Sequence, residues 1–205
     1  MKMLLVILIS YLFGSVPWAL VIGKLFYHKD IRNEGSGNLG ASNAGRVLGK
    51  EAAIAVTVLD ASKAILSMYV ATKIAPGTEL FAGLACCIGH CFPVFAGFHG
   101  GKAVATSYGF MFGICLFMTH QWIWQFLLPV AVFFLVLYLT KMVSVSSITS
   151  LLAEVIVSFI LVPVKGIDVK IPLALLALWC FVTYRHKSNL LRIKNGTENK
   201  IKWMG

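Results

Sequence analysis

The sequence predicts an all-α polytopic integral membrane protein with about seven transmembrane helices. Of its 205 residues, 59% are hydrophobic and 13% are charged, and the mean hydropathy is +0.84. A chain this apolar cannot keep its hydrophobic side chains off a fully aqueous surface. A helix needs roughly 20 apolar residues to cross a bilayer, and such stretches fill most of the chain. We therefore expect residues 1–205 to form a single transmembrane domain.

Hydrophobic blocks between polar breaks define the expected spans. They lie near residues 3–26, 52–74, 80–98, 103–120, 122–140, 142–164 and 171–184. The first block is longer than the apolar region of a signal peptide and lacks a small-residue cleavage site, so we expect it to be retained. Pro17, with Ser15 two residues before it, is expected to kink this span. Five spans with two re-entrant segments would also fit the pattern.

Lysine and arginine predict the orientation. If the C-terminal tail is cytoplasmic, seven spans place the N-terminus outside, with thirteen Lys and Arg residues on the cytoplasmic side. The outer side then receives four, namely Lys2, Lys73, Lys165 and Lys170. The positive-inside rule supports this arrangement. The polar segments 28–51, 99–106 and 185–200 then share the cytoplasmic face, where they can converge on one site.

The net charge of +10 bears on orientation and on anionic ligands rather than on nucleic acid, which we do not expect as a partner.

Segment 28–51 is rich in glycine and in hydrogen-bond donors. Its G-x-G-x-x-G match does not indicate a dinucleotide fold, because that pattern has meaning only between a strand and a helix. Glycine lets backbone N–H groups approach an anion closely, so we expect a phosphate or carboxylate cradle. The alternative is a flexible connection in which glycine and asparagine merely make turns. The expected cradle residues are Gly35, Ser36, Gly37, Asn38, Asn43 and Arg46.

Gly100 and Gly101 precede Lys102 where the fourth span begins, with Thr106 one turn further on. A helix N-terminus presents free N–H groups and a partial positive charge, so this segment is a second candidate anion site. An ordinary glycine turn followed by a cytoplasmic lysine explains it equally well.

The tail begins with Arg185 and His186, and Asn189 follows. On a continuing helix, His186 and Asn189 are three residues apart and can face one ligand. The simpler explanation of the tail alone is a basic stretch attracted to anionic lipid.

Several polar residues lie inside the expected spans. Asp60 and Lys63, three apart, are predicted to form an internal ion pair, whereas Glu154 has no partner that the sequence identifies. His90 lies among cysteines, but a second pair of ligands is lacking, so a buried hydrogen-bonded histidine is favoured over a metal site. We expect no metal.

Together these segments resemble the bacterial acyl-phosphate:glycerol-3-phosphate acyltransferase family, PlsY, over essentially the whole chain. The order and spacing of the runs carry the resemblance. They are Ser15-x-Pro17, Asp30-Ile31-Arg32, Gly35-Ser36-Gly37-Asn38-x-Gly40, Asn43 to Arg46, Asp60-x-x-Lys63, Gly89-His90-x-Phe92-Pro93-x-Phe95, Gly100-Gly101-Lys102, Arg185-His186-x-x-Asn189 and Gly196-x-Glu198. Three positions depart from the family pattern: Ser42 replaces threonine, and Ala64 and Ala103 replace glycine. Ala103 is expected to matter most, because a methyl group could alter the approach of the backbone to phosphate.

The resemblance implies a single acyltransferase domain in the bacterial inner or plasma membrane. The implied reaction moves a fatty acyl group from acyl phosphate to the 1-hydroxyl of sn-glycerol 3-phosphate and gives lysophosphatidic acid and phosphate. No cofactor is implied. The expected partners are the two substrates, membrane lipid and the soluble enzyme that produces acyl phosphate.

The expected roles divide between catalysis and phosphate binding. The expected catalytic residues are Ser36, His186 and Asn189, with His186 acting as base or orienter at the reacting hydroxyl. Alternatively the phosphate of the substrate accepts the proton. The expected substrate-binding residues are Gly35, Gly37, Asn38, Arg46, Gly100, Gly101, Lys102 and Thr106.

Two other classes of function remain open. A transporter for a phosphorylated or anionic solute would also have spans and cytoplasmic basic residues, and it would predict inverted repeats, of which the sequence shows no convincing case. A membrane anchor would explain the spans and the basic tail, but not three donor-rich segments on one face.

Overall fold

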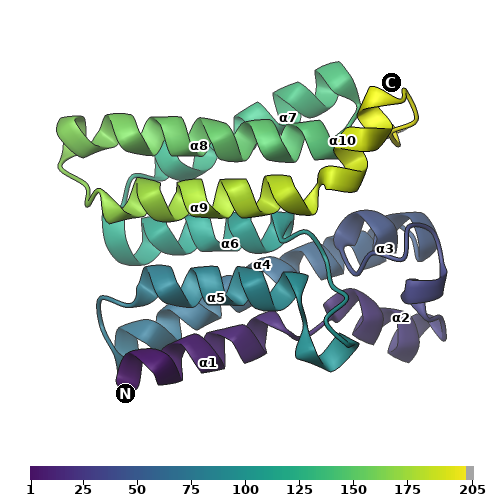
Figure 1. The fold of residues 1–205 in the computed structure, drawn as a ribbon, viewed down its shortest axis with the longest axis horizontal. Coiled ribbons are helices and arrows are strands. Elements are labelled where there is room, and N and C mark those ends of the chain that lie inside the picture. Colours follow the sequence, from purple (N-terminus) through teal and green to yellow (C-terminus); the bar gives the residue numbers. More distant parts are fainter. Residues whose placement is uncertain (202–205) are drawn as a thin grey trace. The chain divides into compact units, whose positions relative to one another are not determined.

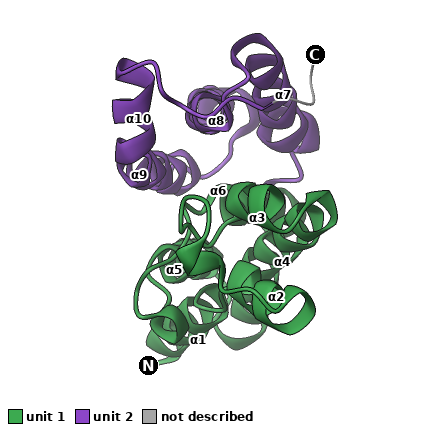
Figure 2. Ribbon diagram, turned by 90° about the vertical axis from the view of Figure 1, so that its right-hand side faces the viewer, with its two compact units in different colours: residues 1–117 green, residues 118–205 purple. Residues whose placement is uncertain are grey.

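The computed structural model describes residues 1–201, and the regular elements of this part of the chain are all helical (Figure 1). This confirms the predicted all-α class. Helices suit a bilayer because they satisfy their own backbone hydrogen bonds where no water is present. The chain divides into two compact units, Met1–Phe117 and Met118–Gly205 (Figure 2).

The first unit carries both glycine-rich segments. Its elements are α1 (Lys2–Gly14), α2 (Trp18–Tyr27), η1 (Ile31–Asn33), α3 (Ala41–Val47), α4 (Lys50–Ile74), α5 (Glu79–Cys91), η2 (Val94–Ala96) and α6 (Val104–Ile114). Helix α4 packs against α1, α3, α5 and α6 and so forms the centre of this unit.

The second unit carries the tail. Its elements are η4 (Ile123–Leu127), α7 (Leu128–Thr140), α8 (Val143–Lys165), α9 (Lys170–Arg185) and α10 (Lys187–Lys194), and the π-helical turn η3 (Cys115–Thr119) continues α6 across the boundary between the units. Helix α8 packs against both α7 and α9. Trp179 of α9 donates a hydrogen bond to the Ile148 carbonyl of α8 at 3.1 Å.

All seven predicted spans are helical, but they differ in length. Within residues 1–201, five helical segments are long and apolar enough to cross a membrane: Lys2–Tyr27, Lys50–Ile74, Glu79–Ala96, Ile123–Thr140 and Val143–Lys165. The other two stretches form the shorter helices Val104–Thr119 and α9. The seven-span count and the orientation of the termini stay predictions.

The predicted kink in the first span is a complete break. Helix α1 ends at Gly14 and α2 begins at Trp18. Pro17 has no N–H to continue the helical ladder. The break leaves the Val16 carbonyl available, and the Lys63 ammonium donates to it at 3.2 Å.

The loop between α2 and α4 is anchored by its own hydrophobic core. Ile31 and Leu39, 0% and 2% exposed, pack in one cluster with Ala19 of α2, Ala44 of α3 and Val56 of α4. Burying two large aliphatic side chains contributes roughly 3–6 kcal/mol, which holds the loop against the helices. The loop is therefore packed against the helices, as a cradle with a fixed shape requires.

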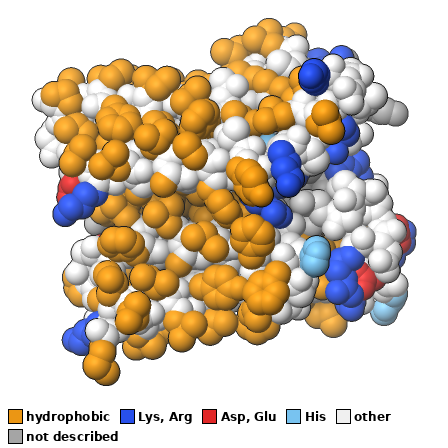
Figure 3. Space-filling model, in the orientation of Figure 1, with side chains coloured by type: hydrophobic (Ala, Val, Ile, Leu, Met, Phe, Trp, Pro, Cys, Tyr) orange, Lys and Arg blue, Asp and Glu red, His pale blue; other side chains and the backbone are white. Residues whose placement is uncertain are grey.

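The outward faces of the helices are apolar. Among the large hydrophobic side chains exposed are Leu8 of α1, Phe81 of α5 and Ile160 of α8. Figure 3 shows hydrophobic side chains over the visible face of each unit, with Lys and Arg gathered around α2 and α3 in the first and around α10 in the second. Such apolar faces suit contact with lipid.

Candidate active site

Asn43 organises the glycine-rich loop from within. Its side chain is 1% exposed. Its Oδ1 accepts a hydrogen bond from the Ser36 backbone N–H at 2.8 Å, and its Nδ2 donates to the Glu34 carbonyl at 3.1 Å. Gly35 lies between these contacts at φ +60°, and a Cβ there would overlap Asn43 Oδ1. Asn43 therefore shapes the loop rather than facing a ligand, which corrects its expected place among the cradle donors.

Arg46 and Ser36, both exposed, lie together on this loop. The guanidinium of Arg46 donates to Ser36 Oγ at 3.3 Å. Within the described part of the chain no carboxylate pairs with Arg46. Its positive charge is therefore uncompensated, as a phosphate site requires.

Arg32, on the same loop, is bound differently. It donates to both carboxylate oxygens of Asp30, at 2.9 and 2.6 Å. The hydrogen bond from Arg32 lowers the pKa of Asp30 well below its ordinary value, and the pair raises the pKa of Arg32. Because its charge is already neutralised, Arg32 is a weaker candidate than Arg46 for binding an anion.

Asn38 connects the loop to the second glycine-rich segment. Its Nδ2 donates to the Gly100 carbonyl at 3.3 Å, across 62 residues of sequence. Two of the three predicted segments are thereby brought together within the first unit. Lys102, half-buried, follows two residues after this contact.

The segment from Gly100 onward leads into the N-terminus of α6. The first backbone bond of this helix runs from Ser107 N–H to the Ala103 carbonyl at 2.7 Å. The N–H groups just before it have no acceptor within the helix. Thr106 is fully buried in this first turn, and its Oγ1 has no hydrogen-bond partner among the described residues. Its hydroxyl and the N–H groups of this first turn are candidate donors for an anion.

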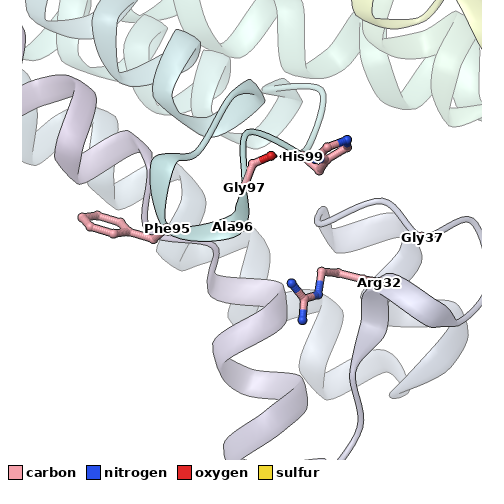
Figure 4. A pocket seen from close by; sticks show the side chains of 6 residues that line it. All are labelled: Arg32, Gly37, Phe95, Ala96, Gly97 and His99. Carbon is pink, nitrogen blue, oxygen red and sulfur yellow. Dashed lines mark hydrogen bonds between the residues drawn. The ribbon is translucent and has the colours of Figure 1, made fainter.

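A cavity of about 410 Å³ lies next to the loop and the turn after α5 (Figure 4). Arg32 and Gly37 line it on one side and His99 on the other, whereas the Phe95 ring is directed away from these groups. His99 Nδ1 donates to the Gly97 carbonyl at 2.6 Å. Of the predicted site residues only Gly37 lines this cavity, so it adjoins the expected cradle rather than containing it.

His186 lies where α9 gives way to α10. It is 3% exposed, and its Nδ1 lies 2.8 Å from the Val182 carbonyl. A carbonyl can only accept, so Nδ1 carries a proton, and Nε2 is the ring nitrogen outside this contact. The helix does not run straight on as the tail spacing assumed, but the Asn189 N–H bonds to the His186 carbonyl at 2.8 Å and keeps the two residues adjacent.

Glu198 holds Asn189 in place. Its Oε1 accepts from Asn189 Nδ2 at 2.6 Å and from Ser144 Oγ at 2.7 Å, and its Oε2 pairs with Arg192 Nε at 2.9 Å. Burial opposes ionisation, but these hydrogen bonds outweigh it and lower the pKa of Glu198. Sequence reasoning placed Glu198 in a family motif without a role, and the spacing of nine residues gave no signal of this contact.

The predicted internal ion pair is confirmed. Lys63 Nζ lies 2.9 Å from Asp60 Oδ1, with both side chains buried. His90 is the buried hydrogen-bonded histidine that the sequence favoured, since its Nδ1 lies 2.9 Å from Lys63 Nζ. Glu154, for which the sequence identified no partner, accepts from Ser158 Oγ at 2.9 Å.

The sequence model of one family, described as glycerol-3-phosphate acyltransferase, matches residues 4–196. The chain belongs to the glycerol-3-phosphate acyltransferase family. It is 41% identical to the glycerol-3-phosphate acyltransferase of Staphylococcus carnosus over 214 residues, covering 100% of both chains. It is 43% identical to that of Listeria monocytogenes serotype 4a over 208 residues, covering 99% of this chain and 98% of the relative.

Solved structures agree with the membership of the glycerol-3-phosphate acyltransferase family. The crystal structure of PlsY, an integral membrane glycerol 3-phosphate acyltransferase, in its glycerol 3-phosphate form, superposes with a TM-score of 0.85 at 32% identity. Its lysophosphatidic acid form gives a TM-score of 0.83 at 31% identity, and each match covers 98% of this chain and 96% of PlsY. The chain is thus an integral membrane protein of an acyltransferase family that serves phospholipid biosynthesis.

Proposed function

We propose that this chain transfers a fatty acyl group from an acyl phosphate to the 1-hydroxyl of sn-glycerol 3-phosphate, giving lysophosphatidic acid and inorganic phosphate. The glycerol-3-phosphate acyltransferase family supplies the acceptor and the reaction class. The proposal adds the acyl donor, the product and the roles of individual residues. The family match extends through both compact units, which supports one acyltransferase domain of residues 1–205.

The observation that carries the proposal is the uncompensated guanidinium of Arg46 on the glycine-rich loop. It is hydrogen-bonded to the Ser36 hydroxyl rather than to a carboxylate. The contact of Asn38 with Gly100 brings the segment of Lys102 and the N-terminus of α6 to the same loop. Two reactants that each carry a phosphate need several such donors, because each dianion must be desolvated in the site.

The proposed chemistry is acyl transfer without a covalent enzyme intermediate. The 1-hydroxyl oxygen attacks the carbonyl carbon of the acyl phosphate, a new ester C–O bond forms, and the C–O bond to phosphate breaks. Phosphate leaves with the electron pair of that bond, and the hydroxyl proton goes to a base. In this proposal Ser36 and Asn189 donate hydrogen bonds to the reacting groups or orient them. The phosphates are held by Arg46, Lys102 and the glycine backbones of both segments.

His186 is proposed as the base or as the group that orients the hydroxyl. Its hydrogen bond to Val182 supports this role, since it fixes the orientation of the ring. The competing route uses the phosphate of glycerol 3-phosphate as base, because a mixed anhydride is already activated. Exchanging His186→Ala separates the two: a loss of kcat by about 100-fold or more supports His186, whereas wild-type turnover assigns the proton to the substrate.

Formation of lysophosphatidic acid by the purified, detergent-solubilised protein tests the function. The protein receives glycerol 3-phosphate with either palmitoyl phosphate or palmitoyl coenzyme A, and chelator is present. Product from palmitoyl phosphate alone is expected. Product from the coenzyme A thioester alone would overturn the donor, and no product from folded protein would favour the transporter.

The location of the site is part of the same proposal. We place it on the cytoplasmic side of a bacterial cell membrane, where a soluble enzyme can deliver acyl phosphate and where lipid can accept the product. The concentration of Lys and Arg in segments 28–51 and 185–200 supports this side. The convergence of the tail with the two glycine-rich segments stays a prediction.

A further inference from the structure

A buried cluster of charged groups lies behind the second glycine-rich segment. Asp60 and Lys63 of α4 and His90 of α5 are 1%, 5% and 6% exposed. Lys63 Nζ lies 2.9 Å from Asp60 Oδ1 and 2.9 Å from His90 Nδ1. Charges are costly to bury inside a membrane protein, and such groups normally serve a site.

The contact with Lys63 fixes the tautomer of His90. An ammonium group has only protons to give, so His90 Nδ1 must be the acceptor at 2.9 Å. The longer separation of 3.4 Å between His90 Nδ1 and Asp60 Oδ1 agrees, because a protonated Nδ1 would make the shorter contact with the carboxylate. The proton of the neutral ring is therefore on Nε2.

The Nε2 side of this ring faces the glycine turn. A Cβ on Gly101 would overlap His90 Nε2, so the Gly101 backbone lies directly against the imidazole. The Gly101 N–H also donates to the His90 carbonyl at 3.1 Å. His90 thus holds the turn with both its ring and its backbone, and Lys102 is the next residue.

The cluster itself is held from a third direction. Lys63 Nζ donates to the Val16 carbonyl, which the break between α1 and α2 leaves available. Lys63 therefore ties the first span and α4 to His90. Because Lys63 bonds to Nδ1, the His90 ring cannot rotate away from Gly101 without breaking this buried hydrogen bond.

We propose that His90 is a positioning residue for phosphate binding, acting through Gly101 to fix the backbone that carries Lys102. The cluster of Asp60 and Lys63 sets the tautomer and the rotamer of His90. This inference rests on the proposed function, because it assigns the turn to a phosphate of one of the two substrates. It explains why charged side chains, rather than apolar ones, lie behind the turn.

The exchange His90→Asn tests the inference. Asparagine places a side-chain oxygen near the position of Nδ1, so it keeps an acceptor for Lys63 but no longer reaches Gly101. The KM of at least one phosphate-bearing substrate should rise about tenfold with kcat nearly unchanged, as for loss of a group that orients a ligand-binding residue. Ile88→Ala, at an exposed position of the same helix, is the control and should leave both constants unchanged.

Gly101→Ala provides the second variant, because a Cβ at this position would overlap the His90 ring and so break the contact between the ring and the turn. It should raise the same KM. In the double variant, His90→Asn with Gly101→Ala, the KM should rise little beyond the single variants, since both remove one contact.

The outcomes separate the inference from the function. Wild-type protein that forms no lysophosphatidic acid refutes the proposed function. Active wild type with unchanged KM values in folded His90→Asn overturns the inference, as does a double variant in which the two effects multiply. If His90→Asn does not fold, Lys63→Gln decides, because it removes the ammonium that holds the ring and leaves the residues of the turn unchanged: a raised KM supports positioning, and unchanged KM values overturn it.

Discussion

Ala103 adopts a backbone conformation that suits glycine. Its φ is +59°, and it caps α6 directly after the Gly100-Gly101-Lys102 run. An L-residue with a Cβ is strained in this left-handed region. Ala103→Gly should therefore stabilise the protein by about 0.5–1 kcal/mol, measured by thermal unfolding in detergent.

The control for this exchange is Ala105→Gly, two residues further along the same helix. Ala105 has ordinary helical backbone, so glycine there should destabilise the protein by up to about 1 kcal/mol. Equal effects of the two exchanges would contradict the account of Ala103. The methyl group of Ala103 is thus expected to cost stability in this left-handed conformation.

Glu198 gives the tail a dependence on pH. Because the folded protein lowers its pKa, the ionised group stabilises the fold above the ordinary value of 4.5, and this contribution is lost as the pH falls below 4.5. Glu198→Gln should therefore unfold at a lower temperature than wild type at pH 7, and the difference should shrink at pH 4. Glu51→Gln, an exposed carboxylate on α4, is the control and should shift the melting temperature little at either pH. A gap between wild type and Glu198→Gln that is the same at both pH values would refute this role.

At the scale of elements, the glycine-rich loop behaves as a folded part of the first unit. Asn43 bonds to the backbone on both sides of Gly35, and removing its side chain leaves partly buried backbone groups without these hydrogen bonds. Asn43→Ala should destabilise the protein by about 2 kcal/mol and lower the activity. Asn33→Ala, on the exposed turn η1 of the same loop, should change stability by less than about 0.5 kcal/mol. Thermal unfolding of both variants checks this, and a similar loss in the two would show that Asn43 does not organise the loop.

A buried polar chain connects elements of the second unit. Thr119 Oγ1 donates to Gln125 Oε1 at 2.6 Å, and Gln125 Nε2 donates to Ser158 Oγ at 2.7 Å. Ser158 in turn donates to Glu154. The π-helical turns η3 and η4 at one end of this chain are thereby fixed to α8, because a buried polar group without a partner is costly in a membrane.

At the scale of the whole molecule, the predicted topology places the N-terminus outside and the tail in the cytoplasm. Single cysteines at two exposed positions test it in a cysteine-free background. Asp168→Cys, between α8 and α9, should react with a membrane-impermeant maleimide in intact cells, because the outer side is expected there. Ser188→Cys, on α10, should react only after the membrane is opened. The reverse pattern would invert the predicted orientation.

Most residues of the candidate site were predicted from local sequence. Residue type alone points to the glycines, Arg46 and Lys102. The ion pair of Asp60 with Lys63 follows from helical spacing. The partner of His90 did not follow, because only packing brings Lys63 to it. The partners of Asn43 and Asn189 are near in sequence, but they depend on the path of the backbone, which no residue pattern specifies. Ser144, which bonds to Glu198 across 54 residues, had no local pattern that pointed to the contact.

By itself the sequence determined that the chain is helical, that it belongs in a membrane and that its donor-rich segments lie between or after the apolar blocks. Those properties depend on the hydropathy and order of residues, which fold locally. Tertiary structure decided which of these residues are paired and which keep an uncompensated charge. Arg32 and Arg46 lie on one loop, and among the described residues only Arg32 pairs with a carboxylate, that of Asp30 two residues before it. The chemistry available to a charged side chain depends on its neighbours in space, and packing supplies those that are distant in sequence, as it brings Lys63 to His90.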